Sequence, residues 1–171
     1  MKKLLLLPVL LFSFVSCAQA PTSFTDEALK EPMKTIDGKE MAFKDILAQY
    51  EGKTIVIDVW ASWCPDCIKG MPKVHALQHQ YKDNDDIVFL FLSYDKTEDA
   101  WKNGREKYHV VGEHYLITSK WKGGGFSDAI RLDWIPRYMI VDPNGNIALF
   151  KAIEADDQKL TSTLQRLVKK K

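Results

Sequence analysis

The sequence contains 171 residues, of which 46% are hydrophobic and 27% are charged, the balance of an ordinary globular protein. Its 24 basic and 23 acidic residues give a formal net charge of +1 at pH 7. This balance argues against nucleic acid as a partner and against electrostatic attraction to an anionic membrane surface. The length fits an export signal followed by one domain with one hydrophobic core.

The first 20 residues have the pattern of a signal peptide. Lys2 and Lys3 form a short basic region, and the apolar stretch from Leu4 to Val15 is too short to span a bilayer. We therefore expect the protein to be exported and this segment to be absent from the folded domain.

Two cleavage patterns overlap at the end of the signal. Residues 14–17, Phe-Val-Ser-Cys, resemble the lipobox of bacterial lipoproteins, which predicts a lipid on Cys17 and attachment to a membrane. Small residues at 16–18 and 18–20 also fit ordinary cleavage, which would remove Cys17 with the signal. We favour lipidation because a leftover cysteine in an exported chain requires an explanation.

The mature chain is expected to have a polar leader at residues 21–32 and a single domain at residues 33–171. An Asp-Gly pair at 37–38 separates two short alternating segments, so we expect a β-hairpin over residues 33–43. A short helical segment over residues 43–50 leads into the centre of the fold.

A buried strand followed by a helix carries the most informative residues. Thr54 to Trp60 is a nearly continuous apolar run rich in β-branched residues, which predicts a strand covered on both faces. Cys64 and Cys67 stand three residues apart at the start of a helical pattern, so one turn places both sulfur atoms at the same end of the helix. Free backbone N–H groups and the helix dipole favour Cys64 as a thiolate, the form that attacks a disulfide.

Asp58 interrupts the apolar strand. A carboxylate is costly to bury in its charged form, so burial at this position predicts a raised pKa and a group able to accept and donate a proton. The alternative is an aspartate at a strand end, held in its ionised form by backbone donors.

The elements after the cysteines alternate between helices and strands. Residues 110–125, which include three consecutive glycines without phosphate-loop spacing, are expected to form a flexible connection. The whole order predicts an α/β fold with a mixed central sheet and helices on both faces. The predicted elements are a helix to Tyr81 bent at Pro72, a strand at 87–94, a helix at 97–108, a short helix at 126–132, a strand at 137–142, a turn at 143–145, a return strand at 146–152 and a final helix capped by Asp156.

Three motifs together resemble the thioredoxin superfamily. They are Trp-Ala-Ser-Trp-Cys-Pro-Asp-Cys at 60–67, Ile-Pro at 135–136 and Val-Asp-Pro-Asn-Gly at 141–145. The export signal, the hairpin and the added residues between Tyr94 and Ile135 make the chain more similar to the TlpA/ResA-like oxidoreductases than to cytosolic thioredoxin. The resemblance implies a thioredoxin-like fold, thiol-disulfide oxidoreductase activity and a periplasmic location.

The resemblance also implies roles for individual residues. Cys64 is expected to be the attacking nucleophile and Cys67 the resolving thiol, with Asp58 exchanging a proton with Cys67. The peptide bond before Pro136 is expected to be cis, with this proline against the cysteines and the backbone of Ile135 free to pair with an extended substrate.

The residues around the cysteines are expected to set partner contact and redox potential. Trp63 is expected to cover the cysteines and to offer an apolar contact surface, whereas Trp60 is expected in the core. Pro65 and Asp66 lie between the cysteines, where a carboxylate raises the pKa of Cys64 and makes the dithiol a better reductant. We therefore expect a disulfide reductase.

The remaining expectations concern one arginine, two histidines and a metal site. Arg137 stands where the resembled group commonly has threonine, so it either shapes partner choice or is a solvated charge, and we favour the solvated charge. His75 and His79 are four residues apart, but they lie beside the apolar stripe and are expected to be solvated. A zinc site would need a second Cys-x-x-Cys, so we expect no metal.

The partners follow from the resemblance. It implies protein disulfide substrates, such as apocytochrome c or oxidatively damaged proteins, a membrane thiol electron donor, and no dissociable cofactor. We expect a monomer. The alternatives are a disulfide-forming oxidase of the same fold and a copper-binding chaperone that uses Cys64, Cys67 and a distant histidine. A peroxiredoxin is excluded because Ile57 and Ala61 replace the Pro and Thr of its motif.

Overall fold

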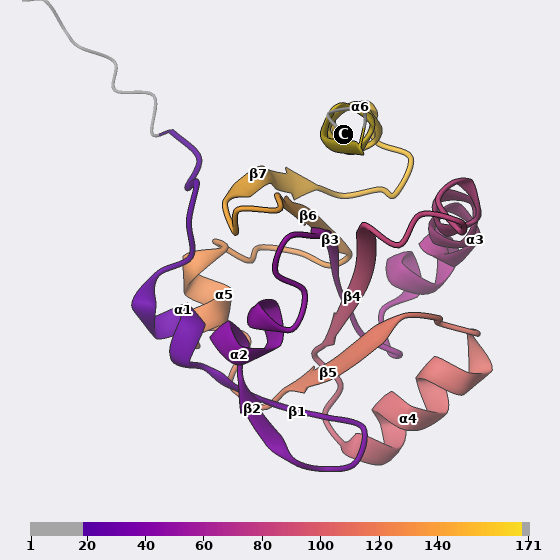
Figure 1. Ribbon diagram of the computed structural model, residues 1–171. Coiled ribbons are helices and arrows are strands. Elements are labelled where there is room, and N and C mark those ends of the chain that lie inside the picture. Colours follow the sequence, from indigo (N-terminus) through magenta and orange to yellow (C-terminus); the bar gives the residue numbers. More distant parts are fainter. Residues whose placement is uncertain (1–18, 169–171) are drawn as a thin grey trace, which may run out of the picture.

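The computed structural model describes residues 19–168, so Cys17 and most of the expected signal lie outside the described residues. A seven-stranded sheet runs through the molecule in the order β2-β1-β5-β4-β3-β6-β7 (Figure 1). Parallel and antiparallel pairs both occur in it, which confirms the predicted mixed α/β fold.

The central strand is β3 (Thr54–Trp60), and all seven of its residues are buried. It pairs in parallel with β4 (Ile87–Ser93) on one side and antiparallel with β6 (Arg137–Val141) on the other. The continuous apolar run predicted this double cover, because a strand with helices over both faces has no side turned to water. The residues that follow β3 are therefore fixed by a rigid strand.

Helices cover both faces of the sheet, as predicted. The helices α3 (Pro65–Gln80), α4 (Glu98–Lys107) and α6 (Gln158–Val168) lie on one side, and α2 (Phe43–Ala48) lies on the other (Figure 1). No helix within residues 19–168 is long and apolar enough to cross a membrane.

Two of the predicted helix starts can be compared directly. Thr97 caps α4, because its side chain accepts a hydrogen bond from the backbone N–H of Ala100 at 3.1 Å. The expectation that Asp156 caps α6 is wrong. Asp157 takes this place and accepts from the N–H of Lys159 at 2.7 Å, because the chain enters the helix one residue later.

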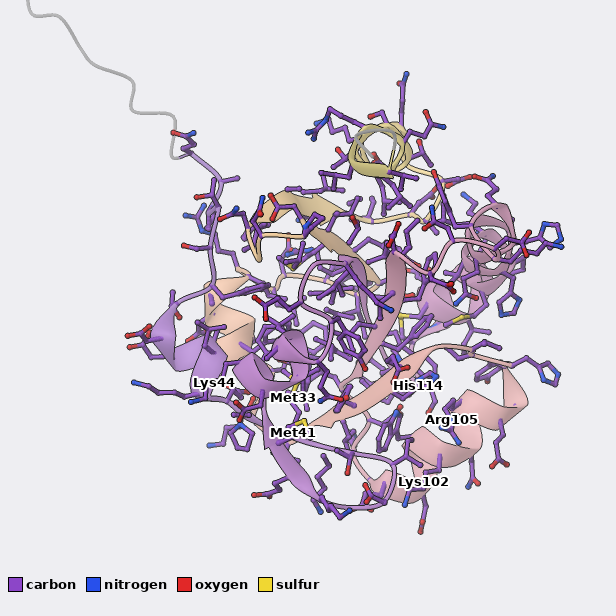
Figure 2. The ribbon with its side chains drawn as sticks, in the orientation of Figure 1. Met33, Met41, Lys44, Lys102, Arg105 and His114 are labelled. Atoms are coloured by element: carbon purple, nitrogen blue, oxygen red, sulfur yellow. A yellow bond between two sulfur atoms is a disulfide. The ribbon has the colours of Figure 1, made fainter. Side chains whose placement is uncertain are left out.

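Two short strands precede the core. β1 (Pro32–Lys34) and β2 (Glu40–Ala42) pair antiparallel around a turn in which Gly38 has φ 83°, a backbone conformation that glycine adopts without steric cost. Met33 and Met41 are directly opposite in this pair and lie side by side (Figure 2). β7 (Ile147–Ala152) pairs antiparallel with β6 at the other edge of the sheet.

The expectation of a flexible connection over residues 110–125 is wrong. Residues 113–117 form β5 (Glu113–Ile117), which pairs in parallel with β4 and antiparallel with β1. Four of its five side chains are buried, including His114, whose ring stacks on Phe91. Pairing with a strand on each side keeps this segment in its extended conformation. The short sequence of the segment does not reveal these neighbouring strands.

The expected leader at residues 21–32 contains a helix that sequence reasoning missed, α1 (Asp26–Lys30). The ring of Phe43 has its centroid 5.0 Å from those of Phe24 and Phe126, both in edge-to-face geometry. Phe126 belongs to α5 (Gly125–Ala129), against which α1 packs. Three aromatic rings therefore join this segment to the core.

Candidate active site

The two cysteines lie at the start of α3, directly after the central strand. Cys64 is the N-cap residue, and its Sγ accepts a hydrogen bond from the backbone N–H of Cys67 at 3.1 Å. Pro65 occupies the first turn, where its missing N–H costs no hydrogen bond. Cys64 and Cys67 form a disulfide. After reduction, the sulfur of Cys64 remains at the positive end of the helix dipole, which favours its thiolate form.

The two cysteines differ little in exposure. Cys64 is 3% exposed and Cys67 is 1% exposed. What distinguishes the two sulfur atoms is the contact that Cys64 makes, because its Sγ lies 3.6 Å from the carbonyl oxygen of Ile135. Cys64 is thus the cysteine that meets the loop before β6.

That loop contains a cis peptide bond between Ile135 and Pro136, as the resemblance implied. β6 begins at the next residue, Arg137, so the central sheet holds one end of the loop. The structure therefore brings the Cys64–Cys67 pair and the Ile135–Pro136 pair together from distant parts of the sequence.

Arg137 is not a solvated charge, and that expectation is wrong. Its side chain is fully buried, and Nη1 donates a hydrogen bond to the carbonyl oxygen of Ile130 at 2.7 Å. Nη2 pairs with the carboxylate of Asp133, which also binds Lys151 at 2.5 Å. Burial lowers the pKa of Arg137, and Asp133 opposes this shift. The guanidinium therefore fastens the segment that leads into the cis proline.

Asp58 lies in the middle of β3 and is 3% exposed, as expected from its place in an apolar strand. Burial raises its pKa to about 8, because the charged form loses hydration, and the Tyr138 hydroxyl opposes the rise. Neither carboxylate oxygen has a partner at hydrogen-bonding geometry within the described residues. Near neutral pH this carboxyl can exist both with and without its proton.

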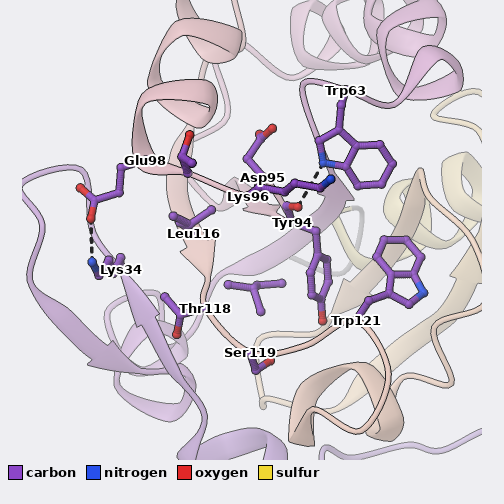
Figure 3. Close-up of a pocket in the computed structure, with 12 residues that line it drawn as sticks. Lys34, Trp63, Tyr94, Asp95, Lys96, Glu98, Leu116, Thr118, Ser119 and Trp121 are labelled. Atoms are coloured by element: carbon purple, nitrogen blue, oxygen red, sulfur yellow. Dashed lines mark hydrogen bonds and ion pairs between the residues drawn. The ribbon is translucent and has the colours of Figure 1, made fainter.

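Trp63 stands on one side of the cysteines and is 51% exposed, whereas Trp60 is fully buried, as expected. The indole Nε1 of Trp63 donates to the carbonyl oxygen of Tyr94 at 3.2 Å. With Tyr94 and Trp121 it forms the aromatic wall of a cavity of about 660 Å³ (Figure 3). An ion pair between Lys34 and Glu98, 2.6 Å apart, closes the opposite side. The cavity lies beside the turn that joins β3 to Cys64.

Trp134 stands on the other side and was missed by sequence reasoning. Its ring is 62% exposed, and its Nε1 donates to Oδ2 of Asp66 at 3.3 Å. Trp134, Asp66 and the half-exposed Ile153 line a groove of about 330 Å³ between α3 and the end of β7. An aromatic residue directly before Ile-Pro was the available signal, since exposed aromatic residues are common at contact surfaces.

Asp95 was also missed. This buried carboxylate accepts hydrogen bonds from the backbone N–H of Ser62 at 3.1 Å, from the Ser62 hydroxyl at 2.6 Å and from the Ser93 hydroxyl at 2.8 Å. It therefore holds the turn between β3 and the cysteines. An acidic residue soon after a buried strand was the signal, although its partner lies 33 residues away.

The histidines do not form a cluster with the cysteines. Nε2 of His75 contacts the carbonyl oxygen of His109 at 3.2 Å. Burial lowers the pKa of His114 to about 4, with a smaller contribution from Arg105. Within residues 19–168, no three His, Cys, Asp or Glu side chains converge as metal ligands.

The chain is similar to known proteins. A family model described as thioredoxin-like matches residues 52–147. The thiol:disulfide interchange protein DsbE of Haemophilus influenzae is 26% identical over 188 residues, covering 99% of this chain and 97% of that protein. The thiol-disulfide oxidoreductase ResA of Bacillus anthracis is 32% identical over 132 residues, covering 77% and 71%. A solution structure from Bacteroides vulgatus, proposed to be a thiol-disulfide oxidoreductase, is 31% identical with a TM-score of 0.66, covering 81% and 86%.

Proposed function

Because the chain belongs to the thioredoxin-like family and is a thiol-disulfide oxidoreductase, we propose that it reduces disulfides of exported proteins with its Cys64–Cys67 pair. The observation that carries this proposal is the position of Cys64 at the N-cap of α3, with its Sγ accepting the backbone N–H of Cys67. The same helix end that donates this hydrogen bond stabilises the attacking thiolate.

The reaction is an exchange of disulfides. The thiolate of Cys64 attacks one sulfur atom of the substrate disulfide, forms a mixed disulfide and releases the first substrate thiolate. The thiolate of Cys67 then attacks the Sγ of Cys64, which forms the Cys64–Cys67 disulfide and releases the second substrate thiolate. Two electrons pass from the dithiol to the substrate, so the protein is oxidised and must be reduced again.

Asp58 is the proposed proton acceptor for Cys67. The thiol of Cys67 must lose its proton before it can resolve the mixed disulfide, and a carboxyl with a pKa of about 8 is suited to take it near neutral pH. Burial of both residues keeps bulk water from competing for this transfer. In the reverse direction, the same carboxyl returns the proton.

The direction of electron flow is proposed from Asp66. Its carboxylate lies one residue before Cys67, in the first turn of α3, where a negative charge opposes a second one on Cys64. A less stable thiolate makes the dithiol a stronger reductant. We expect a reduction potential nearer roughly −270 mV, typical of thioredoxin, than roughly −120 mV, typical of a strong oxidase.

Substrates are proposed to lie across the loop before β6. The backbone of Ile135, next to the cis bond to Pro136 and 3.6 Å from Cys64, is placed to pair with an extended polypeptide. The exposed rings of Trp63 and Trp134 flank this position on either side and provide apolar contacts. A partner protein would thus be held with its disulfide against Cys64.

The cellular setting is proposed from the N-terminal sequence and the family. Export to the periplasm, a lipid on Cys17 and reduction by a membrane thiol donor fit together, because an anchored monomer would stay close to that donor. Growth with a radioactive fatty acid tests the anchor. Label on the wild-type protein and none on Cys17→Ser is the expected result, and an unlabelled wild-type protein would remove the anchor.

The reductase proposal is tested by insulin reduction with dithiothreitol and by capture of partners. Cys67→Ser should accumulate mixed disulfides with exported proteins, because resolution fails, whereas Cys64→Ser, the matched control, should capture none. Absence of captured proteins together with absence of insulin reduction would reject the function. A potential near that of strong oxidases would reverse the direction.

A further inference from the structure

The proposed role of Asp58 raises the problem of how its proton reaches solvent. Asp58 must gain and lose one proton in each catalytic cycle, yet its side chain is only 3% exposed. Neither Oδ1 nor Oδ2 has a hydrogen-bond partner within residues 19–168. A buried carboxyl without contact to water exchanges protons through a neighbouring polar group.

Tyr138 is the polar neighbour that the sheet places against Asp58. The two residues are directly opposite in the antiparallel register of β3 and β6, so their side chains leave the sheet on the same face about 5 Å apart at Cβ. The Tyr138 hydroxyl is close enough to favour the ionised form of Asp58, although it stands outside hydrogen-bonding geometry with either oxygen.

The other end of Tyr138 reaches the groove beside the active site. Tyr138 lines this groove together with Asp66, Trp134 and Gly70. The hydroxyl oxygen lies against Gly70 of α3, 3.8 Å from where a Cβ at that position would stand. Tyr138 is itself 2% exposed, and it meets the groove beside Gly70, which has no side chain to stand between the hydroxyl and the groove.

The charged groups on the groove side also face Tyr138. Burial raises the pKa of Tyr138, as do the negative charges of Asp58, Glu154 and Asp156. Glu154 and Asp156 both pair with Lys73 of α3, at 2.5 and 3.0 Å. The hydroxyl therefore stays protonated at neutral pH and can donate to Asp58 or to water.

We propose that the Tyr138 hydroxyl carries the proton of Asp58 to and from solvent in the groove between α3 and β7, an inference that rests on the proposed role of Asp58. Before Cys67 can give its proton to Asp58, the carboxyl passes the proton that it already holds to the hydroxyl oxygen, while the hydroxyl releases its own to a water in the groove. Tyr138 ends the step unchanged, and Asp58 is again a carboxylate. Tyr138 is thus a positioning residue that acts through Asp58.

The test uses the reduced protein and an aromatic disulfide whose thiol product is coloured. The first colour release reports attack by Cys64, and the second reports resolution by Cys67. Tyr138→Phe keeps the ring and removes the hydroxyl, so we expect the second phase to slow about tenfold at neutral pH with the first unchanged. Tyr115→Phe, which removes another buried tyrosine hydroxyl from the same sheet, is the matched control and should leave both phases unchanged.

Two further measurements separate proton transfer from a structural role. In an Asp58→Asn background, Tyr138→Phe should have no additional effect, because the hydroxyl acts only through the carboxyl. A small soluble base such as imidazole should restore part of the rate of Tyr138→Phe, and none of the rate of Asp58→Asn.

The outcomes distinguish this proposal from the proposed function. If Asp58→Asn leaves resolution unchanged, the proton role of Asp58 itself is wrong. If Asp58→Asn slows resolution and Tyr138→Phe does not, only the Tyr138 route is overturned. The route is also overturned if the effect of Tyr138→Phe is equally large without Asp58, or if it vanishes when rates are compared at equal ionisation of Asp58.

Discussion

The indole Nε1 of Trp134 donates a hydrogen bond to Oδ2 of Asp66 across 3.3 Å. This bond joins the loop before the cis proline to the first turn of the helix that carries the cysteines. The two segments are 68 residues apart in the chain. The partner contact proposed for Trp134 and the charge beside Cys64 are therefore linked by one hydrogen bond.

Trp134→Ala is expected to weaken substrate binding. Trp134 is 62% exposed beside the loop that is proposed to receive the substrate, so its loss should raise KM for insulin about three- to tenfold with little change in kcat. Val111→Ala is the matched control, since Val111 is another exposed apolar residue and lies outside the groove that contains Trp134. Equal effects of the two substitutions on KM would contradict a contact role for Trp134.

Asp66→Asn should change the redox potential. Without the carboxylate, the thiolate of Cys64 is stabilised, so the pKa of Cys64 should fall and the reduction potential should rise by about 20 mV. Equilibration with glutathione measures the potential, and the pH dependence of alkylation measures the thiol pKa. Asp45→Asn, a substitution on the remote helix α2, serves as the control. A fall in potential would show that repulsion is not how Asp66 acts.

Arg137→Met should destabilise the fold. The substitution leaves the carbonyl oxygen of Ile130 without its charged donor in a buried place, which costs about 2–3 kcal/mol in the free energy of unfolding. Urea denaturation of the oxidised protein measures this loss. Lys151→Ala removes the exposed partner of Asp133 and should cost less than about 1 kcal/mol. Similar losses for both would mean that burial of the guanidinium does not matter.

Sequence patterns predicted the parts of the fold that depend on local chemistry. The apolar run of β3, the placement of Cys64 and Cys67 at a helix start and the burial of Asp58 all follow from residues close together in the chain. β5 was missed because its five residues owe their conformation to β4 and β1, which flank it from distant parts of the sequence.

The roles of several site residues were missed for the same reason, because they depend on contacts between distant parts of the chain. The role of Asp95 depends on its hydrogen bond with Ser62, which lies 33 residues away in the sequence. The role of Arg137 depends on the loop around Ile130, which folds over its side chain. Tyr138 looks like an ordinary strand residue until the register of β6 places it opposite Asp58. Pairings across the sheet, rather than motifs, decide these contacts.

The stability of the oxidised protein should depend on pH through Asp58. The folded pKa of about 8 lies above the ordinary value of 3.8, so between these limits the folded protein holds one proton more than the unfolded chain. The free energy of unfolding should therefore fall as pH rises through this window, by at most about 1.4 kcal/mol per pH unit from this group, and level off above it.

Asp58→Asn tests this dependence, because the amide has a similar shape and no titration. Urea denaturation of both oxidised proteins between about pH 5 and pH 8 should show the wild-type protein losing stability relative to the variant as pH rises. The disulfide keeps both cysteines from titrating, so the difference between the two curves reports Asp58 alone. Parallel curves would mean that the carboxyl titrates at its ordinary pKa, and that it cannot exchange protons with Cys67 near neutral pH.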